Sequence, residues 1–419
     1  MASVVGEGTL AELDGWFKRR YGKYVPLVPI NSVLQDVIPF SESDSDGENF
    51  NEPIGLQLEH GVTYAPTNAG AFTLDPPIAA KKKNAQVTGV QHVLRSALDY
   101  EVVVKAAKSE RAFGRATKQS FMDMKESIHK RLEIDLWYGQ DELATCGTVV
   151  TGANGTITPQ IAEWAPGIWS GMEGAKCEIF DSAGTTKRGG THTITEIDLD
   201  LRRIKFDSVD ANVVSTDRVF FKTQRTTSAH NTMMGLHTIL STTSGNIFGI
   251  PTQTYSLWRA TSRSAGSGPL TFAKIQLLVA QMVGKGLDSN VICCVNPKAW
   301  ADLLTEQAAF RQYPTEKVRW DNGSEALRFH SQNGYVDIKA SFYVKEGYAY
   351  VFSPSEWKRV GATDLTFRLP DMGFVGGVSE FFRPLADNAG VEWRCYSHQA
   401  LYSAKIGRSG IMTSIVNTL

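Results

Sequence analysis

One long helical pattern constrains the fold of this chain more than any other feature of its sequence. Between residues 113 and 138, apolar or small side chains recur every three or four positions, which is the spacing of one face of an α-helix. The stripe comprises Phe113, Thr117, Phe121, Met124, Ile128, Leu132 and Leu136. Gly139 follows, at a position where helices commonly end. At 1.5 Å per residue this helix is roughly 38 Å long, and a second patch of Met122, Ile134 and Trp137 predicts a structural spine packed on two sides.

Residues 1–54 predict an extended arm rather than a compact domain. Two prolines push the residues before them, Val25 and Val28, toward extended geometry, and residues 41–51 are polar and acidic. An extended arm cannot bury apolar residues such as Val28, Ile30 and Phe40 against itself. These side chains must lie on the body of the same chain or on a neighbour.

Residues 55–106 predict a long hairpin. Strands are expected at residues 61–65, 86–93 and 97–106, where β-branched residues alternate or cluster. Between the first two lies a loop that contains glycine, prolines and the basic run Lys81, Lys82 and Lys83. Two interpretations stay open: a floppy surface loop, or a projecting loop that lies on a neighbouring subunit.

The remaining chain predicts a β-rich unit followed by mixed α+β structure. The regions in order are 107–145, with the helix; 146–225, rich in short strands; 226–388, of mixed pattern; and 389–419, with a late strand and the C-terminus. Short strands punctuated by Gly, Thr and Asp predict a small barrel or sandwich in the second region. In the third, helices are expected at residues 270–283 and 297–304, and a buried strand at 290–295.

Composition excludes several classes of protein. Lys plus Arg number 43 and Asp plus Glu 44, so the net charge is −1 and no global field favours nucleic acid or anionic membranes. No apolar run approaches the roughly 18 residues of a spanning helix, and the N-terminus shows no secretory signal. The five scattered cysteines predict reduced thiols, as in a cytosolic setting. Cys293 and Cys294 are expected on opposite faces of one strand.

Motifs that carry catalysis or bind metals are missing. The sequence has no phosphate-binding loop, no G-x-S-x-G and no H-E-x-x-H, and none of its eight histidines lies within four positions of another. The acidic segment that starts at Glu42 is similar to a calcium loop, but Pro53 occupies the twelfth position, where such a loop needs glutamate. Asp198 and Asp200 are explained as well by a turn. We expect no catalytic residues, no metal and no cofactor, and therefore no enzyme.

The order of elements resembles the major capsid protein of tailed bacteriophages, which has the Hong Kong 97-type fold. The residues that carry the resemblance are residues 130–140 at the end of the helix, 61–65 at the hairpin, and 234–239 with 245–250. The implied fold is α+β, with an N-arm, an E-loop hairpin, a P-domain with the long spine helix, and an A-domain. In simpler relatives the glycine turn after the spine runs almost directly into the Gly-Leu segment. Here Gly139 and Gly235 are far apart, so we infer an inserted β-rich domain of roughly 80 residues, tolerated at a surface turn.

The resemblance also implies a function. Such a protein self-assembles as hexamers and pentamers into the icosahedral head shell around the double-stranded DNA genome, without sequence-specific binding and without a membrane. Its expected partners are copies of itself, a separate scaffolding protein, a portal and a decoration or cement protein. The expected location is the virion, after assembly in the host cytoplasm. The expected inter-subunit contacts are Val28, Ile30, Phe40, Tyr64, Phe72, Lys81, Lys82 and Lys83.

Three other hypotheses remain open at this stage. One is an encapsulin-like compartment shell of the same fold, with a cargo enzyme inside. Another is a β-rich hydrolase or carbohydrate-binding protein that uses Trp164, Trp169, Trp258 and Trp393 as sugar platforms. In some relatives a hairpin lysine forms an isopeptide bond with a neighbour's asparagine. Lys81, Lys82 and Lys83 lie in the corresponding region, but no asparagine or glutamate of this sequence can be matched to that reaction.

Overall fold

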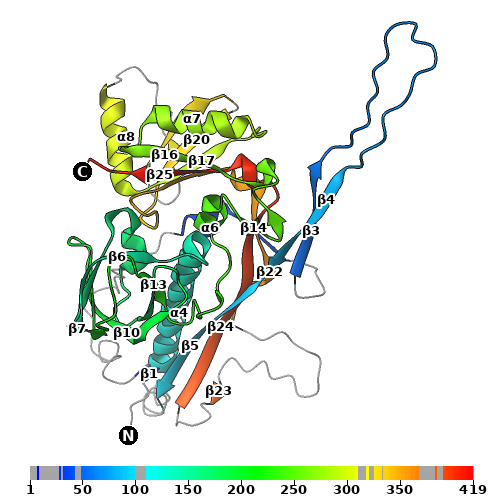
Figure 1. Ribbon diagram of the computed structural model, residues 1–419. Helices are drawn as coiled ribbons and strands as arrows, with labels where there is room; N and C mark the ends of the chain where they lie inside the picture. The colour runs from blue at the N-terminus through cyan, green and yellow to red at the C-terminus, as the bar shows by residue number, and fades with distance from the viewer. Residues whose placement is uncertain are drawn as a thin grey trace, which may run out of the picture.

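Five parts make up the described molecule: a long helix, a small β-barrel, two sheets and a projecting hairpin (Figure 1). The computed structural model describes residues 7–8, 28–29, 32–42, 49–99, 110–309, 318–319, 325–332, 334–367, 383–384 and 390–418. The helix lies between the barrel and the longer sheet, and the second sheet lies across one end of the helix.

The expected spine helix is confirmed as α4 (Glu110–Tyr138). Its stripe is buried from Met124 (4% exposed) to Leu136 (0% exposed), and the Phe121 ring lies 4.2 Å from that of Phe367. The opposite side is buried at Ile134 and Trp137, so the helix packs on two sides as predicted. Met122 of the second patch is 46% exposed, and the side chain of Phe113 lies outside the described residues.

A narrow six-stranded sheet, called the long sheet here because its main strands are long, runs beside the spine. Its strands are β1 (Glu7–Gly8), β5 (Val90–Asp99), β24 (Gly390–Ser403), β22 (Trp357–Thr366), β2 (Phe40–Glu42) and β23 (Arg383–Pro384). The expected late strand is β24, which pairs antiparallel with β5 from Gly390 to Gln399. Between Trp393 and Gln399 alternate residues of β24 are buried, as a strand with one face on a core requires, and the residues from Gln399 to Ser403 are all buried.

The β-rich region forms a closed barrel. Its strands, in barrel order, are β10 (Lys187–Asp198), β11 (Arg203–Phe206), β8 (Thr156–Pro159), β6 (Ala144–Val150), β13 (Arg218–Phe221) and β9 (Lys176–Phe180). A side pair, β7 (Gly152–Ala153) with β12 (Ser208–Val209), and the short helices η1 (Ile161–Glu163) and α5 (Pro166–Trp169) complete it. The sequence predicted either a small barrel or a sandwich here, and the structure is a closed barrel. Closure leaves these six strands without free edges.

The second sheet has seven strands and carries two helices on one face (Figure 1). In sheet order the strands are β16 (Thr261–Gly268), β25 (Gly410–Ile415), β21 (Ala349–Phe352), β17 (Val291–Val295), β20 (Gly334–Ala340), β19 (Glu325–Ser331) and β18 (Val318–Arg319); the helices are α7 (Phe272–Val283) and α8 (Pro297–Ala309). Cys293 packs with these helices, whereas Cys294 packs in the core shared with the spine, so the two thiols lie on opposite faces as expected. Short elements link the parts: α2 (Leu34–Val37), α6 (Leu236–Ser241), β14 (Asn246–Ile247), β15 (Ile250–Pro251), η2 (Ser256–Trp258), η3 (Pro354–Glu356) and η4 (Ile406–Arg408).

The hairpin differs from its prediction at both ends: it begins at Asn49 rather than at residue 55, β5 belongs to the six-stranded sheet rather than to the hairpin, and the tip has no strand. It is built from β3 (Asn49–Gln57) and β4 (Lys81–Thr88), and residues 58–80 form the loop between them. The strand expected at residues 61–65 is wrong: that segment has no ladder, and Gly61 has a φ of +126°. An isolated β-bridge joins His60 to Ile78, and the Asp75 N–H donates to the Thr63 hydroxyl at 2.8 Å. Alternating residue types predicted a strand there, but no second strand is present to pair with it.

Two expectations from composition can be compared directly with the structure. All five cysteines are free and buried, in agreement with the prediction of reduced thiols. Among the described residues, no helix is both long enough and apolar enough to span a membrane.

Candidate functional site

The loop at residues 58–80 carries six exposed large apolar side chains, more than any other described segment of comparable length. Tyr64 is 90% exposed and Phe72 is 51% exposed, and both were expected at inter-subunit contacts. Four further apolar side chains of this loop are more than half exposed, namely Leu58, Val62, Leu74 and Ile78. The loop extends away from the body (Figure 1). Soluble monomers rarely leave such a group of apolar side chains uncovered.

The base of the hairpin, in contrast, is firmly attached to the body. Ala85 and Val87 of β4 are buried, and the Phe50 ring of β3 lies 5.7 Å from that of Tyr402 on β24. The Gln86 N–H donates to the Phe248 carbonyl oxygen at 3.0 Å. A fixed base gives the exposed loop a defined direction, although the loop itself has few internal hydrogen bonds.

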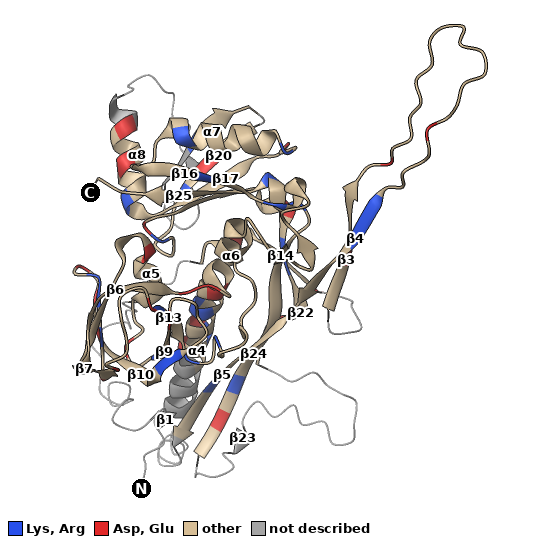
Figure 2. Ribbon diagram, viewed as in Figure 1, with Lys and Arg blue, Asp and Glu red and all other residues tan. Residues whose placement is uncertain are grey.

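Lys81, Lys82 and Lys83 lie at the start of β4, between the loop and the buried base (Figure 2). All three are exposed, and they pair along the ladder with Gln57, Gly55 and Ile54. The Lys83 ammonium lies 5.8 Å from the centre of the Tyr255 ring. The basic run therefore lies on a strand rather than at a flexible tip.

The described part of the N-terminal arm lies on its own chain. Leu34 and Ile38 are buried, and the half-buried Phe40 ring lies 5.7 Å from the Arg359 guanidinium. The sequence left open whether the arm lies on its own chain or on a neighbour, and residues 32–42 lie on their own chain. Val28 is 39% exposed and lies against Gly171. Ile30 lies outside the described residues.

A buried carboxylate holds this part of the arm to the spine. Glu133 of α4 accepts hydrogen bonds from the backbone N–H groups of Val33 (2.9 Å) and Leu34 (2.8 Å) and from the Trp137 indole (3.0 Å). Burial raises the pKa of Glu133, and the hydrogen bonds from Leu34, Gln35 and Trp137 offset only part of that rise. The carboxylate supplies the acceptors that the first N–H groups of α2 lack.

A buried ion pair joins the barrel region to the seven-stranded sheet. The Lys345 ammonium, 0% exposed, lies 2.6 Å from Glu163 Oε2 and donates to the Glu142 carbonyl oxygen at 2.8 Å. The other oxygen of Glu163 accepts from the Tyr348 hydroxyl at 2.7 Å. Burial alone would lower the pKa of Lys345, but the carboxylates of Glu163 and Asp141 outweigh it and raise that pKa.

His237 of α6 lies in the same cluster and is neutral at pH 7. Its Nδ1 is 2.8 Å from the Tyr350 hydroxyl, and its Nε2 is 3.4 Å from Asp141 Oδ2. Burial, and then the nearby Lys345 ammonium, lower its pKa to about 4. A cluster of Lys, Glu, His and Tyr has the residue types of a catalytic site. However, the buried Lys345 and His237 offer a substrate no access, and the interactions join elements of the fold.

The sugar-platform hypothesis is wrong for all four tryptophans. Trp164, Trp169, Trp258 and Trp393 are each at most 2% exposed. Their rings pack in the shared core, so none presents a face to a carbohydrate.

Sequence reasoning missed two groups that matter here. Leu58, Val62, Leu74 and Ile78 were not singled out, although apolar residues in a Gly- and Pro-containing segment without periodicity are a signal of exposed contacts. Glu133 and Lys345 gave no local signal, because their partners lie far along the chain. Val33 is 100 residues from Glu133, and Glu163 is 182 residues from Lys345.

Comparisons with known proteins were informative only at the level of structure. A scan against protein-family models finds no match, and a search of curated proteins finds none either. Among solved structures, a chain from the capsid asymmetric unit of cyanophage A-1(L) matches with a TM-score of 0.51 and 10% identity, over 95% of this chain and 95% of that chain. A chain of Mycobacterium phage Bobi matches with a TM-score of 0.46 and 10% identity, over 96% and 97%.

A chain of the SrpI encapsulin complex from Synechococcus elongatus PCC 7942 matches with a TM-score of 0.40 and 10% identity, over 95% and 94%. At these identities a match shows the fold alone. The cyanophage match, which covers nearly all of both chains, shows that this chain has a capsid fold.

Proposed function

We propose that this chain is the major capsid protein of a tailed bacteriophage and builds its head shell. The observation that carries the proposal is the hairpin, which has a buried base and an exposed apolar loop. In a chain with a capsid fold, a second copy of the same chain is the natural cover for that loop.

Every copy of the chain in a closed shell repeats the same contacts with its neighbours. Apolar side chains such as Tyr64 and Leu74 gain stability when they leave water, and none of the described body covers them. A loop that reaches over a neighbour adds contact area to a standard interface of about 1,600 Å². A head-to-tail contact closes into a ring when its rotation allows, and rings of five and six are the units of an icosahedral shell.

The finer assignments follow from the same proposal. Residues 1–54 are the N-arm, whose last residues begin the hairpin strand β3, and residues 55–106 are the E-loop together with the sheet strand β5 that follows it. Residues 107–145 are the spine of the P-domain, 146–225 the inserted domain, 226–388 the A-domain with its return to the P-domain, and 389–419 the late P-domain strand and the C-terminus. The shell encloses double-stranded DNA, and a net charge of −1 suits an inner wall that does not grip it. A separate scaffolding protein, a portal and a decoration or cement protein are the proposed partners. The virion is the proposed location, after assembly in the host cytoplasm.

Electron microscopy of variants tests the role of the loop. The test variant combines Tyr64→Ser, Phe72→Ser and Leu74→Ser. The matched control combines Val150→Ser, Leu199→Ser and Leu201→Ser, which are exposed apolar residues of the barrel region. Each protein is expressed alone and together with its neighbouring genes. We expect shells from the wild type and the control, and folded but unassembled subunits from the loop variant. Shells of normal yield from the loop variant would refute the proposed contact.

The contents of the particles test the proposed cargo. Particles purified after nuclease treatment are stained for DNA and analysed for co-purified protein. Protected duplex DNA supports the head shell. A protein cargo without DNA would instead identify an encapsulin-like compartment.

A further inference from the structure

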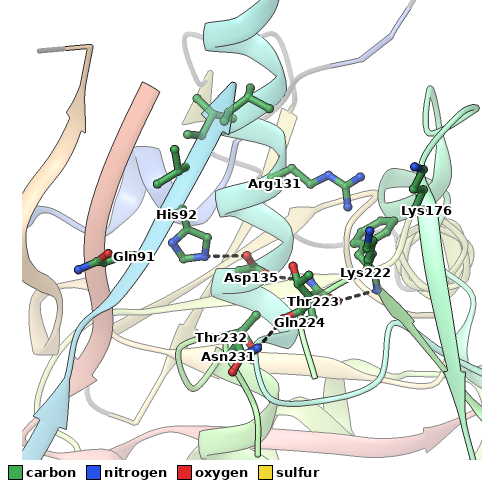
Figure 3. A pocket seen from close by; sticks show the side chains of 14 residues that line it. Gln91, His92, Arg131, Asp135, Lys176, Lys222, Thr223, Gln224, Asn231 and Thr232 are labelled. Atoms are coloured by element: carbon green, nitrogen blue, oxygen red, sulfur yellow. Dashed lines mark hydrogen bonds and ion pairs between the residues drawn. The ribbon is translucent and has the colours of Figure 1, made fainter. Parts of the chain in front are cut away.

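A pocket of about 470 Å³ opens between the spine, the long sheet and the barrel (Figure 3). Its walls come from β5, from α4, from the start of β9 and from the segment that follows β13. Pockets of this volume are typical of sites for small molecules. The elements around it are far apart in sequence, so the pocket is a product of the complete fold.

The lining of the pocket is rich in positive charge. Arg131 of α4 extends toward the side of the pocket where Lys176 and Lys222 of the barrel lie (Figure 3). The one carboxylate in the lining is Asp135. Its Oδ2 lies 2.9 Å from His92 Nε2, and its Oδ1 accepts from the Gln224 amide at 2.8 Å. Among the described residues, none forms an ion pair with Arg131, Lys176 or Lys222.

Arg131 is the most constrained of the three cations. Its guanidinium lies 3.5 Å from the centre of the Phe221 ring, and burial lowers its pKa. A cation removed from water is costly unless a counter-charge compensates it, and contact with an aromatic face offsets only part of that cost. One buried atom without a hydrogen-bond partner among the described residues lines the same pocket, namely Nδ1 of His92.

We propose that this pocket binds a phosphate group carried by a small molecule or by the end of a nucleic-acid strand. Three cations face one carboxylate that is already hydrogen-bonded, which leaves an excess of two positive charges for a dianion such as a phosphate monoester. The planar donors of Arg131 match phosphate oxygens, and the two lysines supply further charge at the rim. The volume leaves room for a group attached to the phosphate.

Thermal unfolding of the full-length chain tests the proposal. Inorganic phosphate is titrated against sodium chloride at constant ionic strength, so that general salt effects are matched. A ligand that binds only the folded chain raises the melting temperature with concentration. The variants are Arg131→Met, Lys176→Met and Lys222→Met. The matched control is Arg263→Met, since Arg263 is half-buried on β16, away from the pocket, and forms no ion pair among the described residues.

We expect phosphate to stabilise the wild type and the control equally. Because a hydrogen bond to a charged group contributes about 1.5–3 kcal/mol, loss of one cation weakens binding about tenfold or more. Lys176 and Lys222 are exposed, so their variants test the site even where Arg131→Met fails to fold. An equal response of the wild type and both lysine variants would overturn the proposal. Tighter binding of citrate than of phosphate would overturn it as well.

Competition separates the two sources of the phosphate. A nucleoside monophosphate and a short single-stranded oligonucleotide with a 5′-phosphate are each added to the phosphate-bound chain. Competition by the mononucleotide alone identifies a small-molecule ligand. Stronger competition by the oligonucleotide, lost in Lys222→Met, identifies a nucleic-acid end. If neither competes, the phosphate-ester site is refuted.

Discussion

Lys345 and Glu163 are single residues on which the attachment of the barrel depends. Each is a charge withdrawn from water, and each is compensated by the other at 2.6 Å. A buried pair contributes modestly as a pair, but removal of one partner leaves an uncompensated charge. The same reasoning does not apply to exposed pairs such as Lys205 with Glu196, which are screened by solvent.

We therefore predict that Lys345→Met lowers the free energy of unfolding by about 3–5 kcal/mol. Urea denaturation of the unassembled chain measures this change. Lys205→Met is the control and should cost less than about 1 kcal/mol. In the double variant Lys345→Met, Glu163→Gln, much of the lost stability should return, because no buried charge is left alone. Equal costs for Lys345→Met and Lys205→Met would contradict this account.

His237 predicts a pH dependence of stability. Burial, followed by Lys345, lowers its pKa to about 4 from an ordinary 6.5. Between these values the unfolded chain binds a proton that the folded chain does not, so stability falls as the pH drops from 6.5 toward 4. His230 shifts in the same direction, so the test compares variants. His237→Gln should flatten the slope of unfolding free energy against pH in this window, whereas His60→Gln in the exposed loop should not.

At the scale of elements, the segment that follows the spine helix and the segment that returns from the barrel meet at the end of the spine. The Gly235 N–H donates to the Gly139 carbonyl oxygen at 2.8 Å, although the whole barrel lies between them in sequence. A Cβ atom at Gly139 would overlap the Met233 carbonyl oxygen, and one at Gly235 would overlap the Gly139 nitrogen. Such a close backbone contact is what an insertion of the β-rich block at one turn would require, and the insertion itself stays a prediction.

Gly139→Ala should lower the free energy of unfolding by about 2–3 kcal/mol, because backbone must move to admit the methyl group. Chemical denaturation measures the loss. Gly190→Ala on β10 is the matched control, since nothing lies within 4 Å of its added Cβ. If Gly139→Ala lowered the free energy of unfolding no more than Gly190→Ala does, the backbone around Gly139 would be shown to move at little cost.

The sequence predicted those elements whose signals are local. The stripe from Phe121 to Leu136 predicted the spine, because a buried helix repeats its apolar residues at a fixed spacing. The neighbouring Cys293 and Cys294 were assigned to opposite faces because strand side chains alternate. The strand expected at residues 61–65 failed because a strand needs a partner, and no sequence pattern shows that the partner is missing.

The candidate sites were less predictable for a related reason. Tyr64 and Phe72 were expected at inter-subunit contacts because the hairpin resembles that of capsid proteins; the structure shows that both side chains are exposed, and the contacts themselves stay a prediction. The pocket at Arg131 was not foreseen, because Lys176, Lys222 and His92 approach Arg131 only after the barrel and the long sheet have packed on the spine. The hydrogen bonds from the arm to Glu133 likewise join residues that lie about a quarter of the chain apart in sequence.

At the scale of the whole molecule, the spine, the barrel and both sheets share one hydrophobic core. Ile157 and Cys177 of the barrel, Leu132 of the spine and Leu401 of β24 belong to one buried cluster. The second cluster, under α7 and α8, adjoins it through the two faces of β17. A domain with its own separate core would melt alone, whereas this barrel shares its core with the spine and the sheets.

We therefore predict one cooperative unfolding transition for the unassembled chain. Calorimetry should give a single peak, and far-ultraviolet circular dichroism should follow the same curve as tryptophan fluorescence. Tryptophans lie in both parts, such as Trp169 beside the barrel and Trp357 in the long sheet. A separate early transition that exposes the barrel tryptophans would contradict the shared core.

The meeting of Gly139 and Gly235 has a mechanical consequence. Tension applied along the backbone can pass from the end of the spine to α6 across a short group of hydrogen bonds, which includes those from the Gly235 N–H and the Thr238 hydroxyl to the Gly139 carbonyl oxygen. The strands between the two segments form a closed side loop. Until those hydrogen bonds break, a force applied to the two ends of the polypeptide is not transmitted through the barrel strands. Its outer turns are therefore free to vary in length and sequence without altering the path that bears the load.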